Sequence, residues 1–121
     1  MAEHNELGNI GELKAQEYLR SKGYAIRHVK WVCGKLELDI VAEKDGWLVV
    51  VEVKTRSTET FEAPEEAITP RKIRNIINAT HEYIQIFDWQ GDTRFDVISV
   101  IPVGQQFKID HIEDAFLAPM M

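Results

Sequence analysis

Hydrophobic and polar residues alternate along two neighbouring segments in the middle of the chain, which together predict a β-hairpin. The segments cover residues 36–44 and 47–56 and are joined by Asp45-Gly46, a strong signal for a two-residue hairpin turn. Successive side chains of a strand point to opposite faces of a sheet. For the first segment this alternation predicts two opposite sets, namely Leu36, Leu38, Ile40 and Ala42 on one face and Glu37, Asp39 and Val41 on the other.

Counting back from the turn brings two carboxylates together across the predicted hairpin, because Asp39 then lies opposite Glu52. Directly opposed side chains are only about 4.5–5.5 Å apart, so like charges there are destabilising and need a compensating partner. A divalent cation is one such partner, since Mg²⁺ is commonly held by one or two carboxylates together with phosphate oxygens. Lys54, two residues after Glu52 on the same face, would place a cation beside that phosphate. The residues therefore predict a metal-dependent site for phosphodiester chemistry.

The segment before the hairpin predicts a helix over residues 5–22, ended by Gly23. Helical spacing puts one stripe of side chains toward the sheet, made of Gly8, Glu12, Ala15 and Leu19. A charged side chain on such a stripe needs a reason, because carboxylates are almost never buried without a partner. On helical position alone, a half-exposed surface glutamate is the simpler interpretation of Glu12.

The remaining pattern predicts a second helix between strands. Residues 24–32 and 93–102 read as strands, and residues 105–111 as an edge strand. Thr69 is a good N-cap, and Pro70 suits the first position of a helix that runs to about Asp88. Its inward stripe is predicted to be Ile73, Ile76, Ile77, Thr80, Ile84 and Phe87. A strand–helix–strand unit favours a right-handed crossover between parallel strands, so the fold class is α/β, in the order αβββαββ with a mixed central sheet.

Three basic residues, Arg71, Lys72 and Arg74, cluster at the start of the second predicted helix. Cations at this end oppose the helix dipole, so helix stability does not explain them. A phosphate would suit both the dipole and the cations, which makes these residues candidate nucleic-acid contacts together with Arg56. A solvated basic turn is the alternative interpretation.

Asp39 followed by Glu52-Val53-Lys54 in a hydrophobic strand is similar to the signature of the PD-(D/E)xK nuclease superfamily. More closely, the chain resembles the YraN-like family of small, largely uncharacterised bacterial proteins, which are related to archaeal Holliday junction resolvases. The resemblance spans roughly residues 5–101 and rests on LGNIGELKAQEYLRSKGY, ELDIVA, VVVEVKTR, EEAITPRKIRNI and RFDVISV, in that order. It implies one endonuclease-like domain over residues 1–121, with a restriction-endonuclease-like αβββαβ core and an extra C-terminal edge strand.

The resemblance also implies an activity, which is hydrolysis of DNA phosphodiester bonds by an endonuclease that uses Mg²⁺ or Mn²⁺, with branched or damaged DNA as candidate substrates. It implies that Glu12, Asp39 and Glu52 bind the metal, together with the backbone carbonyl of Val53. Lys54 would stabilise developing charge or orient the attacking water. Resolvase-like relatives act as dimers, so a homodimer is the expected assembly.

Three further positions differ from the family pattern or have no single predicted role. Relatives usually have Gly-Glu-Ile-Asp where this chain has Leu36-Glu37-Leu38-Asp39, so the glycine is lost while both acids are kept. Glu37 is either an auxiliary metal ligand or the partner of Lys54 in a cross-strand salt bridge. Asp96 belongs to the RFDV block without a matching catalytic role, and we expect it to form an ion pair with a nearby arginine.

The charge balance favours a second hypothesis. The formal net charge is −6, whereas nucleic-acid-binding domains usually carry a basic surface. A non-catalytic nucleic-acid-binding or scaffold module that retains the nuclease fold would fit this balance better. The single Cys33 cannot form an internal disulfide, and no apolar run is long enough to span a bilayer. With no signal-peptide pattern at Met1, we expect a cytoplasmic protein without a membrane partner.

Overall fold

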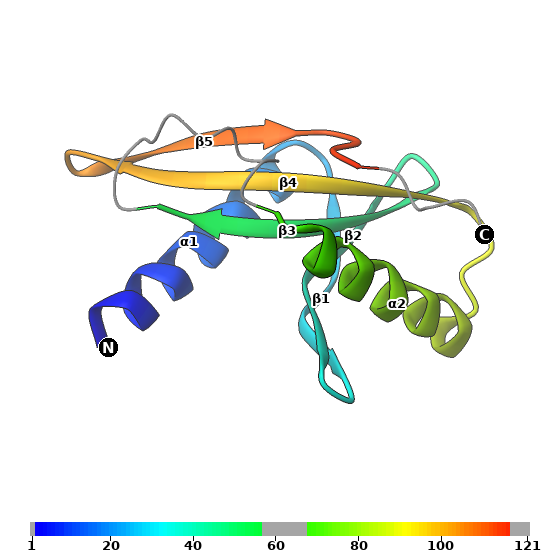
Figure 1. Ribbon diagram of the computed structural model, residues 1–121. Helices are drawn as coiled ribbons and strands as arrows, with labels where there is room; N and C mark the ends of the chain where they lie inside the picture. Colours follow the sequence, from blue (N-terminus) through cyan, green and yellow to red (C-terminus); the bar gives the residue numbers. More distant parts are fainter. Residues whose placement is uncertain (1, 57–67, 117–121) are drawn as a thin grey trace.

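The computed structural model of the protein describes residues 2–56 and 68–116, and its elements follow the predicted order (Figure 1). The elements are α1 (Ala2–Ser21), β1 (Ala25–Cys33), β2 (Leu36–Lys44), β3 (Trp47–Thr55), α2 (Pro70–Phe87), β4 (Asp92–Val103) and β5 (Gln106–Ile112). Thr69 caps α2 as expected, since its hydroxyl accepts the N–H of Lys72, and Pro70 takes the first helical position. Within the described ranges, no helix combines the length and apolar character needed to cross a bilayer.

The strands form one mixed sheet in the order β1-β2-β3-β4-β5. β3 and β4 are parallel and are joined through α2, while the other neighbouring pairs are antiparallel. This confirms the α/β class, the parallel crossover and the placement of β5 at an edge. The hairpin prediction is also confirmed, because Lys44 pairs with Trp47 and the register holds to Ile40 and Val51. Asp45 and Gly46 both have positive φ, of 53° and 84°, as a primed hairpin turn requires.

The two helices cover opposite faces of the sheet. Val49 and Val51 of β3 pack with Ala15 and Leu19 of α1, whereas the alternate residues of β3 pack in a second core beneath α2. Helix α1 lies close to β3, and a Cβ at Gly11 would overlap the Thr55 side chain. The centre of the buried stripe of α1 is therefore a row of small residues and leucine, and Glu12 lies beside that row.

The predicted stripe of α2 needs one correction. Ile76, Ile77 and Thr80 are buried as expected. Phe87 is 37% exposed, however, while Tyr83 is fully buried and had not been predicted. The Tyr83 hydroxyl accepts a hydrogen bond from Arg27 Nε at 2.9 Å and lies 2.7 Å from a ring nitrogen of His28. A tyrosine can be buried here because β1 satisfies its polar end.

The predicted alternation of β2 is wrong at its first half. Leu38 packs in the core beneath α2, but Ile40 packs in the core beneath α1. The change of face coincides with an irregularity in the neighbouring strand, where Lys30 has a left-handed backbone with φ of 52°. Pairing of β1 with β2 passes from Val29–Ile40 directly to Trp31–Leu38, so the hairpin bends at this point. The tip of the β1–β2 hairpin consequently leaves the plane of the other strands (Figure 1).

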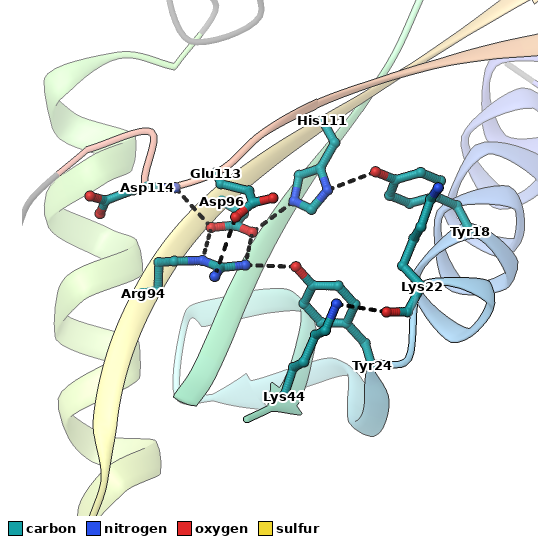
Figure 2. A network of polar contacts seen from close by, with 9 residues as sticks. All are labelled: Tyr18, Lys22, Tyr24, Lys44, Arg94, Asp96, His111, Glu113 and Asp114. Atoms are coloured by element: carbon teal, nitrogen blue, oxygen red, sulfur yellow. Dashed lines mark hydrogen bonds and ion pairs between the residues drawn. The ribbon is translucent and has the colours of Figure 1, made fainter. Parts of the chain in front are cut away.

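Asp96 forms an ion pair with an arginine, as predicted, within a buried polar network (Figure 2). Both of its oxygens accept hydrogen bonds from Arg94, at 2.8 Å each, and the N–H of Asp114 donates at 3.0 Å. His111 Nε2 lies 2.7 Å from Asp96 Oδ2, and the other ring nitrogen lies 3.0 Å from the hydroxyl of Tyr18 on α1. The carboxylate therefore fastens β4 to β5 and, through His111, to α1.

Candidate functional site

The predicted metal-binding residues gather where β2 separates from β3. Backbone pairing of the two strands extends only to Ile40 and Val51. Beyond it, Asp39 Oδ2 accepts the N–H of Val53 at 2.9 Å. The carboxylate thus takes the place of the backbone acceptor that would continue the pairing, and it is held against β3. Asp39 and Glu52 are neighbours, as the register predicted, although the strands no longer pair there; we call these two residues the acid pair.

Glu52 is the most deeply buried member of the candidate site, at 7% exposed. It lies on the α2 face of β3, and its Oε2 is 3.0 Å from the ammonium of Lys72 on α2. Burial raises the pKa of Glu52, and the negative charge of Asp39 and a hydrogen bond with it raise the pKa further, to about 8. Lys72 offsets part of this increase.

Two observations on Glu52 point in opposite directions. An ion pair with Lys72 requires a carboxylate, whereas a pKa of about 8 keeps Glu52 protonated at neutral pH. Burial beside Asp39 outweighs the contact with Lys72, because two adjacent carboxyl groups cannot easily both ionise. Near neutral pH the acid pair then shares one proton and carries one negative charge, which Lys72 balances. The pKa of Lys72 lies above its ordinary value: burial lowers it, but the hydrogen bond with Glu52 and the negative charge of Glu52, Asp39 and Glu37 more than compensate.

Glu12 approaches Asp39 from the α1 side of the sheet. Burial raises its pKa, and so does the charge of Asp39, while Lys30 opposes both. The Oε1 atom of Glu12 is buried and has no hydrogen-bond partner among the residues that the structure describes, although the Lys30 ammonium lies 3.9 Å away. That ammonium donates instead to the side chain of Asn9 at 3.0 Å. A buried carboxylate oxygen without a hydrogen bond is a position at which a cation would be stabilising.

The donor set suits a divalent cation held by few protein ligands. Among the residues that the structure describes, no three His, Cys, Asp or Glu side chains are arranged to hold a metal ion together. The three predicted acids therefore do not form a complete cage in this conformation. The acid pair alone matches the usual Mg²⁺ arrangement, which needs one or two carboxylates and takes its other oxygens from water and phosphate. A contribution from the Val53 carbonyl stays a prediction.

The charged residues around the acid pair differ in how they are placed. Lys54 is exposed, two residues beyond Glu52 on the same face of β3. Glu37 is exposed too, and no ion pair links it to Lys54 in the described part of the chain, so the predicted salt bridge is not formed. Arg56 is half-buried, and its backbone N–H donates a hydrogen bond to the carbonyl of Val100 at 2.9 Å.

Sequence reasoning missed the position of Lys72. Of the three basic residues in the first turn of α2, Lys72 is the one that reaches the acid pair, whereas Arg71 and Arg74 are exposed. One signal could have shown this, because a lysine at the start of a helix is unfavourable without an anion nearby. The sequence could not identify that anion as Glu52, which is twenty residues earlier.

Comparison with known proteins identifies the family. The profile of the uncharacterised protein family UPF0102 matches residues 11–100. A UPF0102 protein from Phocaeicola vulgatus is 51% identical over 120 residues, which covers 99% of each chain. A relative from Bacteroides fragilis is 49% identical over 120 residues, again 99% of each chain, and one from Flavobacterium psychrophilum is 46% identical over 116 residues, 96% of this chain and 98% of the relative. With similarity of this extent, the chain belongs to the uncharacterised protein family UPF0102.

Proposed function

We propose that the protein is an endonuclease that uses Mg²⁺ or Mn²⁺ to hydrolyse DNA phosphodiester bonds, with branched or damaged DNA as candidate substrates. The observation that carries the proposal is the acid pair, a half-buried Asp39 beside a buried Glu52 at the point where two strands separate. Two adjacent carboxyl groups, one with its pKa raised to about 8, weaken the fold unless a ligand compensates them. Their resemblance to the PD-(D/E)xK motif, the restriction-endonuclease-like order of elements and the likeness to archaeal resolvases support the same activity.

Each residue of the site has a distinct role in this proposal. A divalent cation would polarise the scissile phosphate and lower the pKa of a bound water. Asp39 and Glu52 hold the cation, and the orphaned oxygen of Glu12 completes its anionic surroundings from the α1 side. The Val53 carbonyl is the fourth candidate ligand. Exposed Lys54 places its ammonium near the phosphate, where it stabilises developing negative charge or orients the water.

The approach of DNA involves residues outside the acid pair. Arg71 and Arg74 project from the start of α2 toward solvent and, with Arg56, would contact backbone phosphates. A homodimer is the assembly we propose, because a two-fold enzyme can act on both strands of a branched substrate.

A second candidate function is a nucleic-acid-binding or scaffold module without catalysis. The observation that favours it is the formal net charge of −6, which opposes association with a polyanion. The retained Asp39, Glu52 and Lys54 set argues against it, since a scaffold does not need two adjacent carboxyl groups partly shielded from water. Calorimetric titration with Mn²⁺ separates the two functions, because the enzyme must bind metal at the acid pair and Asp39→Asn must weaken that binding.

The activity itself is tested by a cleavage screen with Mg²⁺ and Mn²⁺ over linear, nicked, flapped and four-way DNA. We expect Lys54→Ala to abolish cleavage while leaving metal affinity nearly unchanged, because its ammonium is not a ligand. Arg20→Ala, which removes an exposed charge at the far end of α1, is the matched control and should cleave like the wild type. If the wild type cleaves none of these substrates with either metal, the scaffold function replaces the nuclease.

A further inference from the structure

The Lys72 side chain lies in a position that helix stability alone would disfavour. It is the third residue of α2, and its N–H donates to the capping hydroxyl of Thr69 at 3.1 Å. At this end a helix favours anions, and a cation weakens it. Its ammonium nevertheless points across to β3 and contacts Glu52 Oε2 at 3.0 Å. The acid pair therefore supplies the negative charge that explains a lysine at this position.

Neighbouring cations do not share this arrangement. Arg71 and Arg74 belong to the same turn, but they are exposed and make no ion pair with any residue that the structure describes. The side chain of Lys72 is 51% exposed, whereas that of Glu52 is 8% exposed. Lys72 thus partly covers a buried carboxylate while its own ammonium remains in contact with solvent, so it can leave Glu52 at little cost.

A divalent cation at the acid pair and the Lys72 ammonium compete for the same oxygen. The Lys72 ammonium already lies 3.0 Å from Glu52 Oε2, and a second cation bound to the same carboxyl group would be repelled by it where water is partly excluded. A metal at this site would also be bound directly by the Asp39 carboxylate, with which Lys72 forms no ion pair in the part of the chain that the structure describes. Binding of metal at the acid pair would therefore weaken the Lys72–Glu52 contact.

We propose that Lys72 is a displaceable counter-cation of the acid pair, which holds Glu52 until a divalent cation binds and then turns to a phosphate of the nucleic acid. The proposal rests on the proposed function, since it assumes a metal at Asp39 and Glu52. It gives Lys72 two successive partners, a carboxylate and then a phosphate, and separates it from Arg71, which has only the second. In the absence of metal the same contact closes the α2 side of the site.

Metal affinity tests the first half of the proposal, with calorimetric titration of Mn²⁺ into wild type, Lys72→Gln and Arg71→Gln at one pH. Lys72→Gln should bind Mn²⁺ about fivefold more tightly than wild type, the effect of removing one partly exposed ion-pair partner. Arg71→Gln removes the same charge from the same turn and should change the affinity by less than about twofold. Lys72→Arg, which keeps the charge, should restore the wild-type value.

The outcomes of this titration separate the two proposals. If Lys72→Gln and Arg71→Gln bind Mn²⁺ equally well, Lys72 is not a counter-cation of the site, and the inference is overturned while the proposed function stands. If the wild type binds no Mn²⁺, the proposed function fails and the inference fails with it. A melting temperature equal to that of the wild type in each variant would confirm that differences in Mn²⁺ affinity do not come from loss of the fold.

DNA affinity tests the second half, measured with a labelled four-way junction in EDTA and again in Ca²⁺. Lys72→Gln should lose little affinity in EDTA, when the wild-type lysine is held by Glu52, and several-fold in Ca²⁺, when that lysine is released. Arg71→Gln should lose the same factor in both buffers. Equal losses for Lys72→Gln in the two buffers would mean that Lys72 is an ordinary DNA contact, which contradicts the proposal.

Discussion

Replacing Glu52 by glutamine should stabilise the metal-free protein at high pH and have little effect at low pH. In the folded state the pKa of Glu52 is about 8, against an ordinary value of 4.5. The folded protein therefore holds this proton more tightly than the unfolded chain does. The resulting stability is fully present below about pH 4.5 and is lost as the pH rises through about 8. Glutamine keeps the shape of the side chain and removes the titration.

The size of the effect follows from the separation between these two pKa values. Each pKa unit corresponds to about 1.4 kcal/mol, so ionising Glu52 in its buried site should cost about 5 kcal/mol in total. Because the side chain is only 8% exposed, solvent screening reduces this value little. The Lys72 contact is already included, since it lowers the pKa toward its ordinary value. Most of the loss should fall between pH 5 and pH 8.

Urea denaturation in EDTA, followed by circular dichroism at several pH values from 5 to 9, measures this difference. Glu52→Gln should match the wild type near pH 5 and exceed it by several kcal/mol near pH 9. Glu82→Gln, on the exposed side of α2, is the matched control and should show no such pH dependence. A constant difference between Glu52→Gln and wild type at every pH would refute the reasoning.

Metal should reverse the comparison. A divalent cation replaces the shared proton of the acid pair, so millimolar Mg²⁺ or Mn²⁺ should stabilise the wild type by mass action. Glu52→Gln lacks one anionic ligand and should gain much less. A wild-type melting temperature that does not change in millimolar metal would contradict a metal site at the acid pair.

The remaining predictions concern the fold around the site, and each is measured by urea denaturation against a matched control. Gly11→Ala should destabilise the protein by about 1–3 kcal/mol because the new Cβ overlaps a β3 side chain. Gly8→Ala should instead stabilise α1 by about 0.5–1 kcal/mol, because its Cβ would meet no atom of the described residues within 4 Å; equal effects would show that α1 does not pack this closely. Asp96→Asn should cost about 3 kcal/mol by removing the buried carboxylate that pairs with the half-buried Arg94, while the exposed Asp92→Asn should be near neutral. Burial raises the pKa of Asp96, but its hydrogen bonds and the charge of Arg94 lower the pKa by more, so the net shift is downward from 3.8. The contribution of Asp96 to stability should therefore disappear as the pH falls below about 3.8, and an unchanged cost of Asp96→Asn at lower pH would contradict this assignment. Thr69→Ala should cost about 1 kcal/mol through loss of the N-cap, and no loss would show that the cap is unimportant.

Local chemistry made much of this fold readable from the sequence. The Asp45-Gly46 turn set the hairpin register, because it accepts the two positive φ angles that a tight turn requires. That register by itself predicts that Asp39 and Glu52 are neighbours. Thr69 and Pro70 located the start of α2 in the same way, since capping depends on residues only a few positions apart. Signals of this kind need no knowledge of the rest of the chain.

Other features depend on contacts between residues far apart in the sequence, and only the tertiary structure could decide them. The bend at Lys30 moves Leu38 to the face opposite the one that alternation predicts, because periodicity assumes a regular strand. Lys72, which the sequence predicts only as a DNA contact, also meets Glu52 because α2 packs across β3. Side-chain identity and spacing determine which groups a helix or strand can present. Which group meets which, and how far each is shielded from water, follows only from the packing of one element on another.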